Sequence, residues 1–167
     1  MSEKVTIIAV DPGKTVGIAI YHDGNFSALQ LPARDAVAFI SGAVDGFVEG
    51  GHLPTIAVER FTSGTGPRRA VSAQADATDV IGAMYDISVR HLLDLRRSSA
   101  ADAKAIAPDE RLRQLLWFIE AMPHANDGAR HLWLTIIRLF PQEMFRILED
   151  ARRQRNEAEE LKTSATG

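Results

Sequence analysis

Two β-rich runs joined by Asp11-Pro12-Gly13 constrain the fold of this chain most. Thr6–Val10 is apolar and rich in β-branched residues, which is typical of a buried strand. The proline supplies no backbone N–H and the glycine tolerates unusual dihedral angles, so we expect the strand to end there in a tight turn. A second β-rich run, Val16–Tyr21, follows at once. The sequence therefore predicts two successive strands, with the Asp11 carboxylate held at the end of the first.

A third strand is expected directly after the second. Asp23-Gly24 is flanked by strand-forming residues, and this dipeptide is a strong hairpin signal because both positions can take positive φ. Phe26–Leu31 supplies the third strand, so the first three strands form a meander. Asp35 is expected to begin a helix, which Gly50-Gly51 closes. Apolar residues at helical spacing indicate this helix, and they are Val37, Ile40, Val44, Phe47 and Val48.

A fourth short strand, Thr55–Phe61, also carries an acid near its end, at Glu59. One interpretation is an ordinary charged surface that Glu59 shares with Arg60 where the strand leaves the sheet. The other is that Glu59 faces Asp11 across neighbouring strand ends, which is where open α/β sheets bind ligands. A buried parallel strand normally has no acid at its C-terminal end without a partner. Glu59 is therefore a candidate site residue.

The middle of the chain predicts a helix, a strand and a polar loop. The helix covers about Arg69–Tyr85 and is rich in small residues, which let another element pack closely against it. Ile87–Leu95 has the composition of a strand and would complete a five-stranded sheet. Arg96–Arg113 is polar and of alternating charge, as expected of a solvated loop. Leu112–Met122 is expected to be helical until Pro123 stops it.

The last informative stretch runs from His124 to His131. His124 and Asp127 are three residues apart, so at the start of a helix they project from the same side, and His131 lies one turn further along. Taken alone, Asp127 is also compatible with a simple helix cap. The helix is predicted from a buried stripe, which consists of Ala129, Leu132, Trp133, Ile136, Ile137 and Phe140. Pro141 divides the chain into a domain over residues 1–141 and a charged helix and tail over 142–167.

Composition narrows the classes of protein. The 167 residues suffice for one domain with a sizeable core. The absence of cysteine excludes disulfides, thiolate catalysis and cysteine-bound zinc, and it fits a reducing cytosol. No apolar run is long enough to span a bilayer and no signal-peptide layout is present, so we expect a cytoplasmic protein without a membrane partner. A formal net charge of −3 neither indicates nor excludes nucleic-acid binding, because carboxylates at a metal site lower the total.

Three features occur together in one known family: Asp11-Pro12-Gly13 with Gly17, Val58-Glu59, and the stretch from His124 to His131. The chain resembles the RuvC-type Holliday junction resolvases of the ribonuclease H-like superfamily, and most of all their small bacteriophage versions. The resemblance implies an α/β fold with a five-stranded mixed sheet, whose first three strands are an antiparallel meander, flanked by helices. It also implies a homodimeric endonuclease that binds four-way DNA junctions and nicks two strands symmetrically, in the host cytoplasm if phage-encoded.

The same resemblance implies that Asp11, Glu59, His124 and Asp127 are the catalytic and metal-binding residues. His124 departs from the usual pattern, because most members have Asp there and only some have His. Gly128 stands where Ala is usual. Oxygen ligands suit Mg²⁺ or Mn²⁺, and two such ions about 3.5–4 Å apart activate water and stabilise the leaving oxygen. No small-molecule cofactor is expected.

Several side chains are candidates for contacts with DNA or with a second copy of the chain. Phe61 is a candidate for stacking on an unpaired base at the junction, or else a core residue. The small-residue helix over Arg69–Tyr85 is the hypothesised homodimer contact. Basic residues are candidates for phosphate contacts, although each is compatible with ordinary surface charge, and they are Lys14, Arg68, Arg69, Arg96, Arg97, Lys104 and Arg130.

Two other classes of function are compatible with the sequence. A catalytically silent ribonuclease H-like module would bind branched DNA or a protein partner without needing divalent metal. An ATPase or kinase fragment is suggested by the run from Asp11 to Thr15, which resembles the first phosphate loop of actin-like kinases. Those proteins need two such domains, whereas this chain supplies one.

Overall fold

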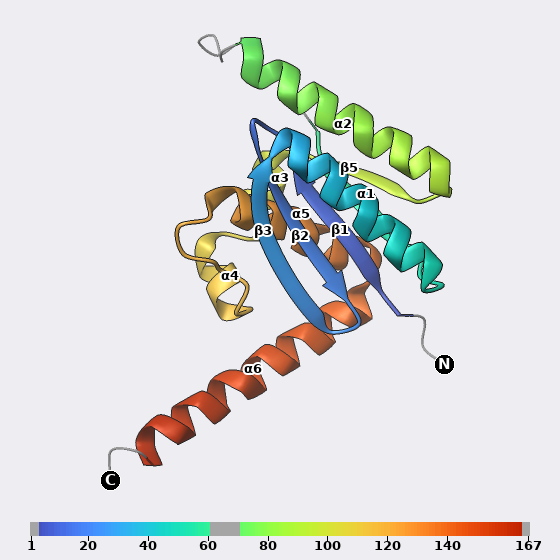
Figure 1. Ribbon diagram of the computed structural model, residues 1–167. Coiled ribbons are helices and arrows are strands. Elements are labelled where there is room, and N and C mark those ends of the chain that lie inside the picture. Colours follow the sequence, from blue (N-terminus) through green and yellow to red (C-terminus); the bar gives the residue numbers. More distant parts are fainter. Residues whose placement is uncertain (1–3, 61–70, 165–167) are drawn as a thin grey trace.

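The computed structural model describes residues 4–60 and 71–164, with side chains in the second range from residue 74 onward. A five-stranded sheet with the order β3-β2-β1-β4-β5 forms its centre (Figure 1). The strands are β1 (Thr6–Asp11), β2 (Thr15–His22), β3 (Asn25–Pro32), β4 (Thr55–Glu59) and β5 (Leu95–Ser98). The helices are α1 (Ala33–Glu49), α2 (Val71–His91), α3 (Ala100–Ile106), α4 (Asp109–Gln114), α5 (Pro123–Leu139) and α6 (Pro141–Ser164). Among the described residues, no helix is both long and apolar enough to cross a membrane.

The pairing of the strands confirms the predicted mixed sheet. β2 runs antiparallel to both β1 and β3, so the first three strands form the expected meander. β4 runs parallel to β1, and β5 runs parallel to β4. Val10 of β1 is paired with Val58 of β4. Asp11 and Glu59, the next residue of each strand, therefore lie side by side at one edge of the sheet.

Alternation of side chains gives the sheet two different faces. Ile8 and Val10 belong to a core cluster with buried residues of α1 and α2, whereas Ile7 and Ala9 belong to a second cluster with residues of α5. Figure 1 shows α1 and α2 on one side of the sheet and α5 on the other. Asp11 continues the Ile7 and Ala9 series, so its side chain lies on the α5 face. That face also carries small residues, which let α5 pack close to the sheet and include Ala9, Ala19 and Ala57.

The fifth strand lies later in the chain than the sequence predicts. The prediction of a strand over Ile87–Leu95 is wrong, because α2 continues to His91 and β5 begins only at Leu95. Val80, Met84 and Ile87 recur at helical spacing and are buried in the cluster between α2 and the sheet. Burial of this helical stripe outweighs the local strand composition.

The segment before α5 also differs from the prediction. Leu112–Met122 is not one helix, because α4 ends early and both Leu116 and Ala121 have positive φ. The polar stretch predicted to be a solvated loop instead contains β5, α3 and α4. Asn126 fixes the irregular segment, since its amide accepts from Ile119 N at 2.9 Å and donates to Ile119 O at 2.8 Å. These side-chain bonds replace the backbone bonds that a continuous helix would make.

Helix α6 begins at Pro141, where the sequence predicts a break, and extends away from the sheet (Figure 1). Its first half is attached to β2. The Tyr21 hydroxyl donates a hydrogen bond to Glu143, and Arg146 donates to the Tyr21 hydroxyl at 3.2 Å. The division into a domain over residues 1–141 and a separate C-terminal part stays a prediction.

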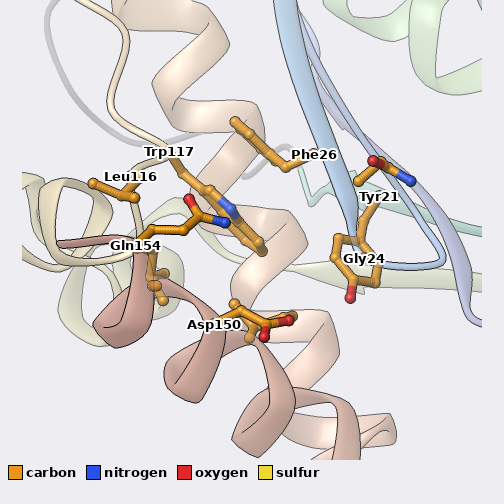
Figure 2. A pocket seen from close by; sticks show the side chains of 11 residues that line it. Tyr21, Gly24, Phe26, Leu116, Trp117, Asp150 and Gln154 are labelled. Carbon is orange, nitrogen blue, oxygen red and sulfur yellow. The ribbon is translucent and has the colours of Figure 1, made fainter. Parts of the chain in front are cut away.

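A pocket of about 220 Å³ lies between α6, the β2–β3 hairpin and the segment that follows α4. Figure 2 shows Tyr21, Phe26 and Trp117 around it, together with Asp150 and Gln154 from α6. The rings of Phe26 and Trp117 are stacked, with centroids 4.5 Å apart. The hairpin adjoins the first residues of β1, so this aromatic pocket lies at the opposite end of the strand from the Asp11 carboxylate.

Candidate active site

Two carboxyl groups meet at the edge of the sheet where β1 and β4 end. Asp11 is the last residue of β1, and Glu59 is the last residue of the parallel neighbour β4. Their side chains are hydrogen-bonded to each other. This confirms the expectation that Glu59 faces Asp11 across the strand ends. A hydrogen bond between two carboxyl groups needs a proton on one of them.

The pKa values of the two carboxyl groups are shifted in opposite directions. Burial, the hydrogen bond to Glu59 and the negative charges of Glu59 and Asp127 raise the pKa of Asp11 to about 8, while Lys104 acts weakly in the opposite direction. Burial also acts to raise the pKa of Glu59, but hydrogen bonds from His131 and Asp11 hold that pKa below its usual value. The site therefore gathers acidic groups whose negative charges, together with burial, favour a proton on Asp11.

Helix α5 brings His124 to this pair. His124 lies in the first turn of the helix, and its Nδ1 is 3.2 Å from Asp11 Oδ2. The backbone of α5 can lie this close because Gly17 has no side chain against the His124 carbonyl group, and Gly128 has none against the backbone of Gly17. The His124 side chain is 45% exposed, whereas Asp11 is buried. The imidazole therefore lies on the solvent-exposed side of the site, and the aspartate lies on its buried side.

Asp127 is held by two cations. Arg130 Nη1 donates to Asp127 Oδ1 at 2.5 Å, and Lys104 Nζ lies 3.7 Å from the same oxygen. Arg130 also pairs with Asp109 and donates to the carbonyl oxygen of Ala107 at 3.1 Å. The side chain of Arg130 is only 11% exposed, so it is part of the wall of the site. The alternative of a simple cap for Asp127 is excluded, because no side chain caps the start of α5.

Sequence reasoning missed the partners of Glu59. His131 is buried, with Nε2 at 3.4 Å from Glu59 Oε2 and Nδ1 at 2.7 Å from Ser98 Oγ. Ser98 is the register partner of Glu59 on β5. The position of His131 one turn beyond Asp127 was a usable signal, but Ser98 gave none because the predicted fifth strand ended before it.

Comparison with known proteins identifies the fold. The sequence matches no protein-family model, and no curated protein shows significant similarity to it. RuvC from T. thermophilus, in a structure with a Holliday junction substrate, is similar with a TM-score of 0.56 and 16% sequence identity, over 81% of this chain and 96% of that chain. A second Thermus thermophilus RuvC structure gives a TM-score of 0.50 and 14% identity over the same shares. The fold is that of RuvC.

The RuvC fold confirms the resemblance drawn from the sequence motifs, while the bacteriophage-like detail stays a prediction. Of the residues predicted to contact DNA, Lys14 is exposed in the turn after Asp11, and Lys104 is exposed beside Asp127. Arg96 and Arg97 are exposed on β5, and Arg96 is paired with Asp94 at 2.7 Å. Their contacts with DNA stay predictions. Arg130, a further candidate, is paired with Asp127 and Asp109. The remaining candidates lie outside the described residues, and they are Phe61, Arg68 and Arg69.

The donor set of this RuvC-like site fits a hard divalent cation by its chemistry. Carboxylates and an imidazole are gathered at one point, and a bound cation would offset both the burial and the neighbouring negative charges that raise the pKa of Asp11. In the described part of the chain, however, no three acidic or histidine side chains are arranged so that they could hold an ion. Each donor instead has a protein partner, since Arg130 binds Asp127 and His131 binds Glu59. The donor groups lie close together, but in this arrangement they do not surround the position of a single ion.

Proposed function

We propose that the protein is a metal-dependent endonuclease that cuts branched DNA, such as a four-way junction, by phosphodiester hydrolysis. The observation that carries the proposal is the acid cluster at the strand ends, where burial and then the neighbouring Glu59 and Asp127 raise the pKa of Asp11 to about 8. Strongly shifted acids of this kind are concentrated at functional sites. The similar T. thermophilus RuvC structure contains a Holliday junction substrate, which supports branched DNA as the substrate class.

In this proposal the residues of the site have different roles. Asp11, Glu59 and Asp127 hold up to two Mg²⁺ or Mn²⁺ ions, and His124 is a further ligand or takes a proton from water. Divalent ions at such a site, when bound, supply an activated water and stabilise charge on the leaving oxygen. Lys104 and Arg130 neutralise Asp127 in the metal-free protein and limit its side-chain freedom.

A homodimer is part of the proposal, because two symmetric nicks call for two sites related by a two-fold axis. Helix α2 offers a contact surface, since exposed residues recur along it at alternating spacings of three and four, as in a helix–helix seam. These residues are Ala75, Thr78, Gly82, Tyr85 and Val89. Tyr85 and Val89 are 63% and 61% exposed, and a Cβ on Gly82 would meet no atom within 4 Å. Ala77, in contrast, is buried and belongs to the core.

A synthetic four-way junction incubated with the protein and Mg²⁺ tests the proposal. Wild-type protein should introduce symmetric nicks, while Asp11→Asn, Glu59→Gln and Asp127→Asn should each lower the rate by at least about 100-fold and still bind the junction. Each replacement keeps the shape of the side chain and removes the charge that would hold a cation. Asp79→Asn, on the exposed side of α2, is the matched control and should cut normally.

The outcomes separate the alternatives. A junction that wild-type protein binds but leaves intact in Mg²⁺ and Mn²⁺ would support the catalytically silent module instead. Near-normal cutting by Asp11→Asn would disprove the proposed site. Turnover of ATP without cutting would favour the kinase-like alternative.

A further inference from the structure

Two residues outside the proposed ligand set fix the position of Glu59. His131 Nε2 lies 3.4 Å from Glu59 Oε2, and His131 Nδ1 lies 2.7 Å from Ser98 Oγ. Glu59 and Ser98 are register partners at the ends of the parallel strands β4 and β5, so their side chains leave the sheet on the same face. α5 packs on that face and places the imidazole between them. At 1% exposure, His131 is too deeply buried to meet a DNA strand itself.

The direction of these hydrogen bonds follows from the chemistry of the three groups. Glu59 as a carboxylate only accepts hydrogen bonds, and His131 Nε2 is the ring nitrogen that faces it. Nε2 of His131 must then carry a proton. In a neutral imidazole the other nitrogen is an acceptor, so the Ser98 hydroxyl donates to Nδ1. The opposite tautomer would set a nitrogen lone pair against a carboxylate oxygen.

We propose that His131 and Ser98 are positioning residues for Glu59, a role that rests on the proposed metal-dependent function. Ser98 fixes the tautomer and the ring plane of His131, and His131 fixes the Glu59 oxygen that it binds. The free side of the carboxylate is then kept toward Asp11, with which it forms its other hydrogen bond. Hydrogen-bond partners of ligating groups typically change metal affinity by about 10–100-fold when they are removed.

Mn²⁺ binding in the absence of DNA tests this role without measuring cleavage. Ser98→Ala and His131→Leu should each weaken Mn²⁺ binding by about tenfold or more. Calorimetry or the EPR signal of free Mn²⁺ measures this affinity. His131→Gln should retain more Mn²⁺ affinity than His131→Leu, because the glutamine amide can donate a hydrogen bond to Glu59 in place of Nε2. Ser88→Ala is the matched control, since Ser88 is a serine whose hydroxyl also makes a hydrogen bond, but to the Met84 carbonyl oxygen at 2.7 Å in α2. The control should bind Mn²⁺ like wild type.

The imidazole itself gives a second signature that needs no metal. ¹⁵N NMR of the metal-free protein at neutral pH should show His131 as the neutral Nε2–H tautomer, and Ser98→Ala should mix in the Nδ1–H form. A wild-type Nδ1–H tautomer, or Mn²⁺ affinities of Ser98→Ala and His131→Gln equal to wild type together with an unchanged tautomer, would overturn the positioning role. Wild-type protein that binds no Mn²⁺ and cuts no junction would overturn the proposed function, and this inference with it. Folding is checked by thermal unfolding, and Ser98→Ala and His131→Gln still decide the matter if His131→Leu does not fold.

Discussion

A Cβ atom added to Gly17 would lie 1.7 Å from the carbonyl oxygen of His124, so β2 and the start of α5 touch backbone to backbone. This contact sets the height of α5 above the sheet and hence the reach of His124 to Asp11. We expect Gly17→Ala to push the helix away, to cost about 1–3 kcal/mol or more in the free energy of unfolding, and to abolish cutting. Urea unfolding and a junction-cutting assay measure the two effects.

Gly46→Ala is the matched control for the Gly17 replacement. Gly46 lies within α1, and a Cβ there would meet no atom within 4 Å. Alanine has the higher helix propensity, so this change should leave cutting intact and raise stability by up to about 1 kcal/mol. If Gly17→Ala unfolds and cuts like wild type, the close contact does not position the site.

The fold was predictable where local patterns and tertiary packing agree. Asp23-Gly24 predicted the β2–β3 hairpin, and both residues have positive φ in the structure. Ile87 is the opposite case, because its β-branched surroundings favour a strand while its spacing from Val80 and Met84 completes a helical stripe. Only the sheet that buries this stripe decides between the two, and that sheet is a tertiary feature.

The stability of the metal-free protein should depend on pH through Asp11. Its pKa in the folded protein is about 8, above the usual 3.8, so the unfolded chain releases this proton first as the pH rises. The stability associated with protonated Asp11 is complete below about pH 4 and is lost progressively up to about pH 8. In EDTA at pH 8, Asp11→Asn should therefore be more stable than wild type by up to about 5 kcal/mol, with little difference at pH 4.

Urea unfolding of both proteins at the two pH values checks this, with Asp79→Asn as the exposed control acid. Mg²⁺ should reverse the order at pH 8, because it stabilises only the protein that can offer an ionised Asp11. Equal stability of wild type and Asp11→Asn at pH 8 in EDTA would show that ionising Asp11 does not destabilise the folded protein.

The homodimer proposal makes a prediction for α2. Tyr85→Glu places a charge on the exposed stripe and should convert the dimer to a monomer, seen by sedimentation or light scattering. Cutting should then lose its symmetry, because a monomer carries one site. Arg90→Glu, on an exposed residue of the same helix outside the stripe, should remain dimeric. A Tyr85→Glu protein that is still dimeric would place the contact elsewhere.

The sequence indicated the candidate ligands of the site, Asp11, Glu59, His124 and Asp127, but not the groups that hold them. Asp11 and Glu59 end apolar strands, and a charged residue in that position stands out in a sequence. Arg130 was expected to contact DNA, but the structure commits its guanidinium to Asp127, Asp109 and the Ala107 carbonyl oxygen. Ala107 and Asp109 belong to the segment formed by α3 and α4. The path of this segment depends on side-chain hydrogen bonds and on burial, which no local sequence pattern encodes.

The last prediction concerns His124, the one proposed ligand that departs from the usual aspartate. Its Nδ1 lies 3.2 Å from Asp11 Oδ2 and its side chain is open to solvent, so it can reach both an ion and a water. A neutral imidazole can ligate or accept a proton and an imidazolium can do neither, so cutting should fall as the solution becomes acidic. His124→Asp should retain substantial activity and move this acid limb to lower pH, while His124→Ala should lose most activity. Imidazole is a softer ligand than carboxylate, so Mn²⁺ should support wild-type cutting at least as well as Mg²⁺. Initial rates from pH 5 to 9 in each metal decide the matter, and a His124→Ala protein that cuts at the wild-type rate throughout would show that α5 acts through Asp127 and not through His124.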